Sequence, residues 1–113
     1  MWRTLVIMLA VLILGISAAS AASVNLDKYR NAKGEELKGI YKIYLDGVRE
    51  GLVVHSAMQN QETRIFCMPG NLALTIDQAE DIMLRFANDR KMPGDSPISI
   101  LLLGGLQATF PCR

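Results

Sequence analysis

The sequence predicts a small all-α fold, a disulfide-tied bundle of three main helices behind a short N-terminal segment. Three observations lead to this prediction. Apolar residues recur at helical spacing in three separate segments, and capping or stop signals bracket the last two of them. Alternation of apolar and polar residues is confined to residues 63–68, which are too few to carry a sheet. Residues 24–33 are polar and predict an irregular stretch or a short helical turn.

Residues 35–58 form the first predicted helix, because their apolar side chains recur at steps of three and four. Gly39, Gly47 and Gly51 interrupt this pattern, and each costs about 1 kcal/mol relative to alanine inside a helix. We therefore expect a second helix or a second chain to approach the backbone closely at Gly47 and Gly51, with simple tolerance of glycine as the alternative. The predicted apolar stripe consists of Leu37, Ile40, Tyr41, Tyr44, Leu45, Val48 and Leu52.

The second predicted helix begins after Thr75, which forms a capping box with Gln78. Acidic residues near its start and basic residues near its end agree with the helix dipole. The Pro93-Gly94 pair is a stop signal, so we expect residues 88–95 to form the loop that follows. The predicted core stripe of this helix is Ala79, Ile82, Met83, Phe86 and Ala87.

The third predicted helix has Ser96 as its N-cap and Pro97 at its first position. Gly104-Gly105 weakens its middle, where we expect a kink. The helix should end near Phe110, because the residue before a proline disfavours the α region. Its predicted buried stripe is Ile98, Leu101, Leu102, Leu106 and Phe110.

Residues 1–22 have the layout of a cleaved secretory signal peptide. Seventeen of these 22 residues are apolar, a positive charge at Arg3 precedes the apolar run, and a stretch of alanine and serine follows it. We expect cleavage after Ala21 or Ala22, which leaves residues 23–113 as a single domain outside the cytosol. An uncleaved membrane anchor is the alternative interpretation.

Cys67 and Cys112 are the two cysteines of the chain. In an exported protein, an even cysteine count predicts a disulfide. Closing a loop of about 46 residues would contribute about 4 kcal/mol in the chain-entropy model. Two buried free thiols are the alternative. A metal site is not expected, because two cysteines and the single His55 cannot complete a four-ligand shell without carboxylates.

Charge and size exclude several classes of function. The chain has 113 residues with 12 basic and 11 acidic side chains, and it becomes neutral once Arg3 is removed with the leader. A neutral domain argues against nucleic acid or an anionic membrane surface as the main partner. No cofactor-binding motif is found, and His55, which follows two apolar residues, is expected to be a partly buried structural residue rather than a catalytic base. We therefore expect a protein that binds rather than an enzyme.

Three sequence elements resemble those of a known family. They are Tyr44-Leu45-Asp46-Gly47, Phe66-Cys67-Met68-Pro69 and Phe110-Pro111-Cys112. In this order behind a signal peptide, the chain resembles the Tai-type periplasmic immunity proteins, which neutralise peptidoglycan amidase effectors delivered by type VI secretion. The resemblance implies a disulfide between Cys67 and Cys112, frequent homodimers, no enzymatic activity, and inhibition by occluding the effector's catalytic cleft. The chain departs from many members in lacking a cysteine ahead of Tyr44, and in having glycines at positions 104 and 105.

The resemblance raises the question of which loop meets the effector. We expect the loop of residues 88–95, which mixes charge with a rigid Pro-Gly turn, and the more flexible loop of residues 59–64 is the alternative. Two other functions fit an exported helical protein with one disulfide: a periplasmic acid-stress chaperone, or an envelope structural protein that dimerises through Gly47 and Gly51. The expected partner-binding residues are Asn88, Asp89, Arg90, Lys91 and Asp95.

Overall fold

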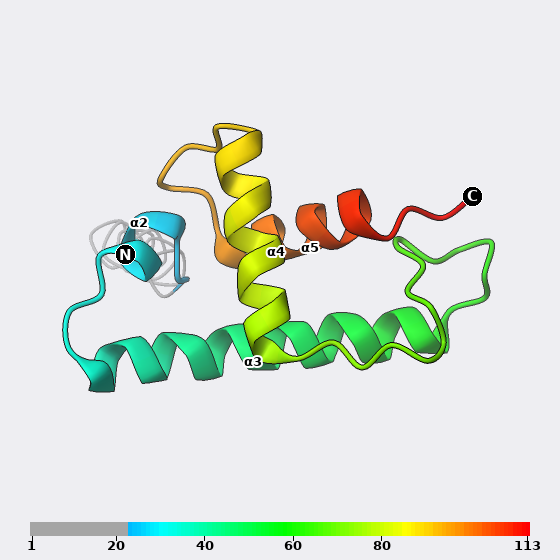
Figure 1. Ribbon diagram of the computed structural model, residues 1–113, viewed down its shortest axis with the longest axis horizontal. Coiled ribbons are helices and arrows are strands. Elements are labelled where there is room, and N and C mark those ends of the chain that lie inside the picture. The colour runs from blue at the N-terminus through cyan, green and yellow to red at the C-terminus, as the bar shows by residue number, and fades with distance from the viewer. Residues whose placement is uncertain (1–22) are drawn as a thin grey trace, which may run out of the picture.

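The computed structural model describes residues 23–113, and within this part of the chain it contains four helices and no strand (Figure 1). The predicted all-α fold is confirmed, whereas the predicted signal peptide, residues 1–22, lies outside the described residues. Among residues 23–113, none of the helices is both long and apolar enough to span a bilayer. The helices are α2 (Leu26–Arg30), α3 (Glu35–Met58), α4 (Ile76–Asp89) and α5 (Ile98–Thr109).

The short helix α2 is tied to the segment that precedes α5. The backbone N–H of Leu26 donates to the carbonyl oxygen of Ser96 at 2.9 Å, and the N–H of Ile98 donates to Val24 at 3.0 Å. Val24 and Leu26 are buried, so apolar side chains reinforce this backbone pairing. The N-terminal segment is therefore part of the core, although its composition is mostly polar.

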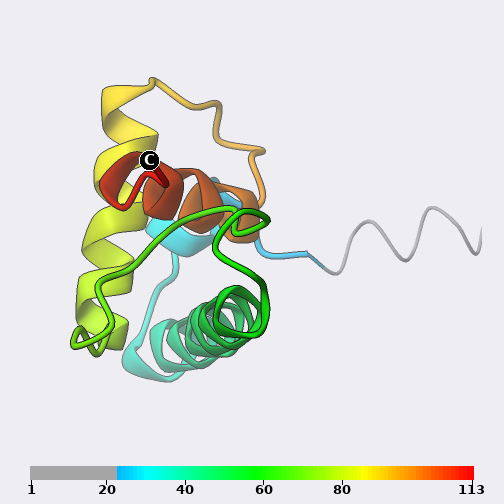
Figure 2. The same ribbon diagram turned by 90° about the vertical axis from the view of Figure 1, so that its right-hand side faces the viewer.

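Helix α3 has the predicted bounds and lies along one side of the molecule, where α4 crosses over it (Figure 1). Viewed end-on, α3 has α4 and α5 on one side only, and no other described element covers its far side (Figure 2). Only Leu45 and Ser56 of this helix are buried. The predicted apolar stripe of α3 is confirmed in part, because Tyr41, Val48 and Leu52 pack against the core beside Leu45. Leu37, Ile40 and Tyr44 are exposed, contrary to expectation.

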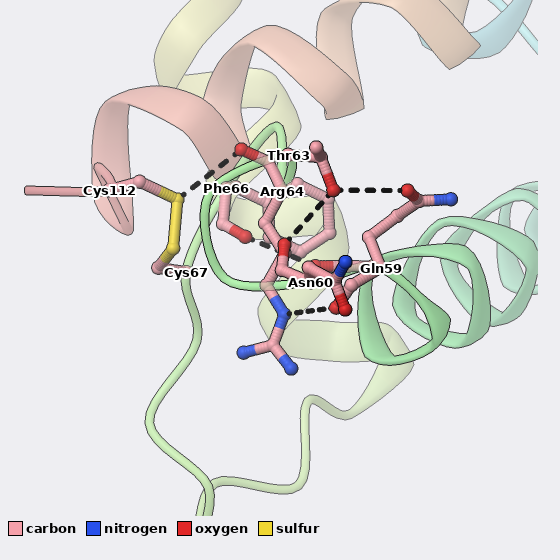
Figure 3. Close-up of a disulfide and its surroundings, with 8 residues drawn as sticks. Gln59, Asn60, Thr63, Arg64, Phe66, Cys67 and Cys112 are labelled. Carbon is pink, nitrogen blue, oxygen red and sulfur yellow. Dashed lines mark hydrogen bonds between the residues drawn. A yellow bond between two sulfur atoms is a disulfide. The ribbon is translucent and has the colours of Figure 1, made fainter.

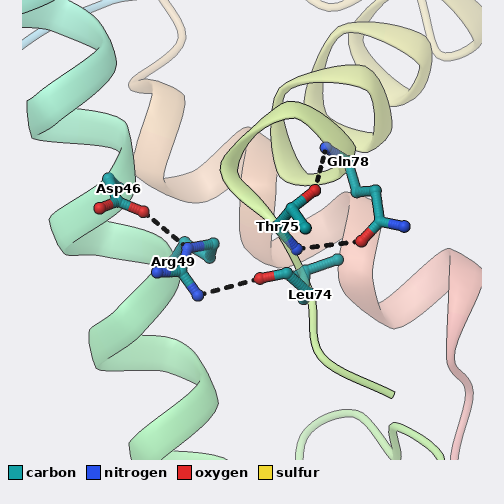
Figure 4. Close-up of polar contacts among 5 residues, drawn as sticks. All are labelled: Asp46, Arg49, Leu74, Thr75 and Gln78. Atoms are coloured by element: carbon teal, nitrogen blue, oxygen red, sulfur yellow. Dashed lines mark hydrogen bonds and ion pairs between the residues drawn. The ribbon is translucent and has the colours of Figure 1, made fainter.

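The start of α4 is set by polar contacts, as the sequence predicts. The capping box forms, with Gln78 N–H donating to Thr75 Oγ1 at 3.2 Å and Thr75 N–H donating to Gln78 Oε1 at 2.9 Å (Figure 4). Arg49 of α3 donates to the carbonyl oxygen of Leu74 at 3.0 Å and to Asp46 at 2.7 Å. These contacts fix where α4 starts relative to the middle of α3.

Helix α5 begins one residue later than predicted. Pro97, not Ser96, is the N-cap, with an extended backbone and no side-chain capping bond. The reason is that Ser96 is engaged elsewhere: it is buried, its carbonyl accepts from Leu26, and its N–H donates to Pro93 at 3.1 Å. The predicted end of the helix is confirmed, because Phe110 is its C-cap.

The core lies mainly between α4 and α5. The predicted stripes are confirmed except at Phe86 and Phe110, which are only partly buried. Gly104-Gly105 do not interrupt α5, which is helical from Ile98 to Thr109, and the kink expected there stays a prediction. A Cβ added at Gly105 would lie 2.8 Å from Ile82 Cγ2 and 3.0 Å from its carbonyl oxygen. The two glycines therefore let α5 approach α4 closely.

Candidate functional site

The predicted partner-binding residues are all exposed at the C-terminal end of α4 and in the loop after it. The loop is shorter than expected, because Asn88 and Asp89 belong to the last turn of α4 and Arg90 is its C-cap. Lys91 follows with a φ of 50°, a left-handed conformation that turns the chain away from the helix axis. Asp95 is exposed further along the loop.

The backbone of this loop is held at both ends. Met92 N–H donates to Ala87 at 2.9 Å, which closes the end of α4, and Asp27 N–H donates to Gly94 at 2.9 Å, which ties the Pro-Gly turn to α2. The side chains of Arg30 and Asn88 are hydrogen bonded to each other. The loop is therefore positioned by α2 as well as by α4.

The charged side chains of the loop remain available to a partner. Arg90 lies over the ring of Phe86, with 5.5 Å between the guanidinium carbon and the ring centroid. Among residues 23–113, none of Asp89, Lys91 and Asp95 forms an ion pair. The loop thus combines a fixed backbone with unpaired charges of both signs.

A second exposed surface runs along the side of α3 that the other elements leave open. Its residues, here called the α3 seam, recur at alternating steps of three and four, the spacing of a helix-packing face. Ile40, Val54 and Met58 in this seam are 54%, 51% and 80% exposed. The α3 seam consists of Leu37, Ile40, Tyr44, Gly47, Gly51, Val54 and Met58, all of them exposed.

Gly47 and Gly51 lie at the centre of the α3 seam. No atom of the described chain beyond the helix itself lies within 4 Å of a Cβ added at either position. Among residues 23–113, no other helix approaches them, so a close approach by one of these helices is ruled out, and approach by a second chain stays a prediction. Sequence analysis missed the seam because three of its apolar residues, Leu37, Ile40 and Tyr44, were assigned to the buried stripe. The regular spacing from Leu37 to Met58 was the available signal.

The predicted disulfide is confirmed, and the free-thiol alternative is wrong. Cys67 and Cys112 are bonded, with 4.9 Å between their Cα atoms (Figure 3). Cys67 N–H also donates to the carbonyl oxygen of Phe110 at 2.8 Å. The covalent bond and the hydrogen bond together fasten the end of α5 to the connection between α3 and α4.

Two polar contacts link α2 and α3 to α4. The hydroxyl of Tyr29 donates to Glu80, and Lys42 pairs with Asp77 at 2.6 Å. Burial, followed by the hydrogen bond to Glu80 and the charges of Glu80 and Asp77, raises the pKa of Tyr29 above its ordinary value of 10.0. The hydrogen bond and charge of Asp77 raise the pKa of Lys42.

The single histidine is not where the sequence suggested. His55 is exposed near the end of α3, with Gln59 Nε2 3.5 Å from its Nε2 atom, so the expected partial burial is wrong. His55 lies on the side of α3 that faces solvent, because α4 and α5 cover the other side. Among residues 23–113, no three histidine, cysteine or acidic side chains are grouped to hold a metal ion.

Comparison with known proteins identifies the family. The family model of the Rap1a immunity proteins matches residues 18–112, a span that includes all four helices. No curated protein and no solved structure gives a significant match. An immunity protein acts by binding a cognate secreted effector, a role that needs an exposed recognition surface rather than catalytic groups. The chain therefore belongs to the Rap1a immunity protein family.

Proposed function

We propose that this protein is a periplasmic immunity protein of the Tai type. It binds a peptidoglycan amidase effector delivered by type VI secretion and occludes its active-site cleft, which protects the producer and its sister cells. The family match supports the immunity role, and the leader-like residues 1–22 support export. The observation that carries the proposed mode of binding is the loop after α4, whose backbone is fixed while its charged side chains are exposed.

A fixed loop is suited to inhibition for a thermodynamic reason. Ordering a flexible loop on binding reduces affinity, at a cost of about 0.5–1.5 kcal/mol for each immobilised long side chain. In this protein the hydrogen bonds of Met92 and Gly94 already order the loop backbone. Asp89, Lys91 and Asp95 then supply groups that can pair with polar atoms lining a cleft.

Replacement of the four charged side chains tests this mode of binding. The protein with Asp89, Arg90, Lys91 and Asp95 changed to alanine should bind the effector at least about tenfold more weakly, a loss of about 1.4 kcal/mol. Its helical circular dichroism should be unchanged, because these side chains are exposed. Candidate amidases co-expressed in the periplasm would identify the effector by rescue from lysis, and calorimetry would give the affinity.

The alternative loop provides the matched control. Alanine at Gln61 and Glu62, which are exposed in the connection after α3, should leave the affinity unchanged. If the fourfold variant binds as tightly as the parent, the loop after α4 is not the recognition element. If the parent protein rescues cells from none of the amidases, the proposed function itself is wrong.

We also propose that the protein is a homodimer in which the α3 seams of two copies cross. The spacing of the seam is symmetric about position 49: Ile40 matches Met58, Tyr44 matches Val54, and Gly47 matches Gly51. A two-fold axis through this point places the same residues opposite each other in both copies. The glycines allow close approach at the crossing, and the larger side chains fill the space where the helices diverge.

Glutamate at Gly47 and Gly51 tests the homodimer. A Cβ added at either position meets no atom of residues 23–113, so the fold should be retained, whereas like charges should meet at the crossing of two copies. Sedimentation should give a dimer for the parent and a monomer for the double variant. Gly39→Glu is the control, because Gly39 is equally open but lies off the seam. A monomeric parent would remove the homodimer from the proposal.

A further inference from the structure

An apolar pocket opens beside the disulfide, between the last turns of α3 and the connection that leads to α4. Its volume is about 190 Å³. Small-molecule sites occupy roughly 300–1,000 Å³, so this pocket is suited to a single large side chain rather than to a cofactor. The lining residues, which define the Arg64 pocket, include Val53, Ala57, Arg64, Phe66, Met68 and Leu72.

Arg64 supplies the available polar group of this pocket. The other polar side chain in the lining, Ser56, already donates its hydroxyl to the carbonyl oxygen of Phe66 at 3.1 Å. Arg64 Nε donates to the carbonyl oxygen of Gln59 at 3.1 Å, and its two terminal nitrogens point away from the other residues drawn (Figure 3). No acidic side chain of residues 23–113 forms an ion pair with Arg64.

The walls of the pocket are fixed before any partner arrives. Phe66 is fully buried and is held to α3 by Ser56, while the next residue, Cys67, is held to α5 by the disulfide. The Cys112 sulfur also lies 3.5 Å from the carbonyl oxygen of Arg64. An oxidised sulfur has no proton to donate, so this is a packing contact. The pocket is therefore an ordered feature of the fold.

The rim of the pocket is apolar and exposed. Leu72, which lines the pocket, is 36% exposed, and Pro69, which also lines it, is exposed. Well-packed apolar pockets beside an arginine are common anchor points in protein interfaces. The guanidinium adds a preference, because its free edge matches the geometry of a carboxylate.

We propose that the Arg64 pocket anchors a segment of the effector in which a large apolar side chain stands next to an aspartate or glutamate. The apolar side chain fills the pocket and the carboxylate meets the terminal nitrogens of Arg64. The identity of this partner rests on the proposed function. The recognition chemistry rests on the pocket itself. The pocket is a second contact with the effector, in addition to the charged loop after α4.

Short peptides test the pocket without the effector. Acetyl-Leu-Asp-amide is titrated into the oxidised, ¹⁵N-labelled protein, with acetyl-Leu-Asn-amide and acetyl-Ala-Asp-amide as matched controls. The first peptide should shift the amide signals of Phe66, Met68 and Leu72 saturably. Both controls should bind about fivefold more weakly or not at all. The asparagine peptide lacks the carboxylate, and the alanine peptide lacks the large apolar side chain. Equal binding of the three peptides, or shifts elsewhere only, would overturn the proposal.

Two variants separate the carboxylate contact from the apolar contact. Arg64→Gln should remove the difference between the aspartate and asparagine peptides, whereas Arg85→Gln, an exposed arginine on α4, should preserve it. Ala57→Trp should block the pocket from the surface of α3, where Ala57 is exposed. An aspartate preference that survives Arg64→Gln would contradict the assigned role of Arg64.

The same variants are then measured against an effector that the parent protein neutralises. Arg64→Gln and Ala57→Trp should each weaken binding by at least about tenfold while the melting temperature stays close to that of the parent. If both variants bind normally, the pocket is not an effector anchor and the immunity function stands. If the parent neutralises no effector but the peptides bind as described, the immunity function fails and the peptide specificity of the pocket stands.

Discussion

Two pairs of helical glycines show how differently the same residue can be used in one small protein. Gly104 and Gly105 lie where α5 crosses α4, and added Cβ atoms would come within 2.5 Å of Phe86 and 2.8 Å of Ile82. Gly47 and Gly51 lie on α3, and nothing from another element lies within 4 Å of either one. The first pair is required by packing within the chain, whereas the second weakens a helix with no compensating contact among residues 23–113. The proposed homodimer would supply the contact that the second pair lacks.

Removing the disulfide should have the largest effect on the unfolding free energy. The bond fastens α5, the partner of α4, to the connection that begins at the end of α3. The variant with serine at both Cys67 and Cys112 should lose about 4 kcal/mol of unfolding free energy in the chain-entropy model. Denaturant titration measures the loss, and the parent protein under reducing conditions should show a similar one. A loss below about 1 kcal/mol would mean that the helices hold together without the bond.

Alanine at Gly105 should be the next most damaging change. The added methyl group meets the backbone carbonyl of Ile82, which cannot move without shifting α4. We expect a loss of about 1–3 kcal/mol in unfolding free energy. The atoms nearest to a methyl group added at Gly104 belong to the ring of Phe86, which is partly exposed and can turn aside, so alanine there should cost less. A stabilising effect at Gly105 would contradict the close crossing of α4 and α5.

Alanine at Gly47 and Gly51 should act in the opposite direction. Measured at a concentration low enough to keep the protein monomeric, each change should raise the unfolding free energy by about 0.5–1 kcal/mol, because alanine favours the helix and meets no neighbour. Repeating the measurement at high concentration sharpens the comparison. If a second chain packs on these glycines, the gain should shrink as the dimer forms.

The smallest expected effect concerns the attachment of α2 to α4 through Tyr29 and Glu80. The raised pKa of Tyr29 means that the folded state holds the phenol proton more tightly than the unfolded state does. This contribution is complete below pH 10 and is lost as the pH rises above 10, where only the unfolded state has ionised. Equilibrium unfolding from pH 8 to 11 should therefore show a steeper decline for the parent than for Tyr29→Phe. Parallel declines would rule out this linkage.

Local signals in the sequence were sufficient for most of the fold. The capping box at Thr75, the bounds of α3 and the end of α5 before Pro111 all depend on neighbouring residues, which a sequence displays directly. The displaced start of α5 does not depend on neighbouring residues, because Ser96 forms a backbone hydrogen bond with α2. Such a pairing joins two segments that no local pattern connects.

The candidate sites were less predictable for a related reason. Helical periodicity shows that α3 has an apolar face, but it does not show whether a neighbour from the same chain covers that face. The whole stripe of α3 was therefore assigned to the core, although Leu37, Ile40 and Tyr44 are exposed. The Arg64 pocket depends on how the connection from Arg64 to Leu72 folds back against α3, and no periodic pattern describes a connection of this kind.

The pairing of Val24 and Leu26 with Ser96 and Ile98 has a consequence for the order of assembly. These partners are about 70 residues apart in the chain, so the N-terminal segment has no docking site until almost all of the polypeptide has been made. Loop closure over such a distance is slow compared with the formation of a single helix. Until α5 has been synthesised, the side chains of Val24 and Leu26 therefore lack the partners that bury them in the folded protein.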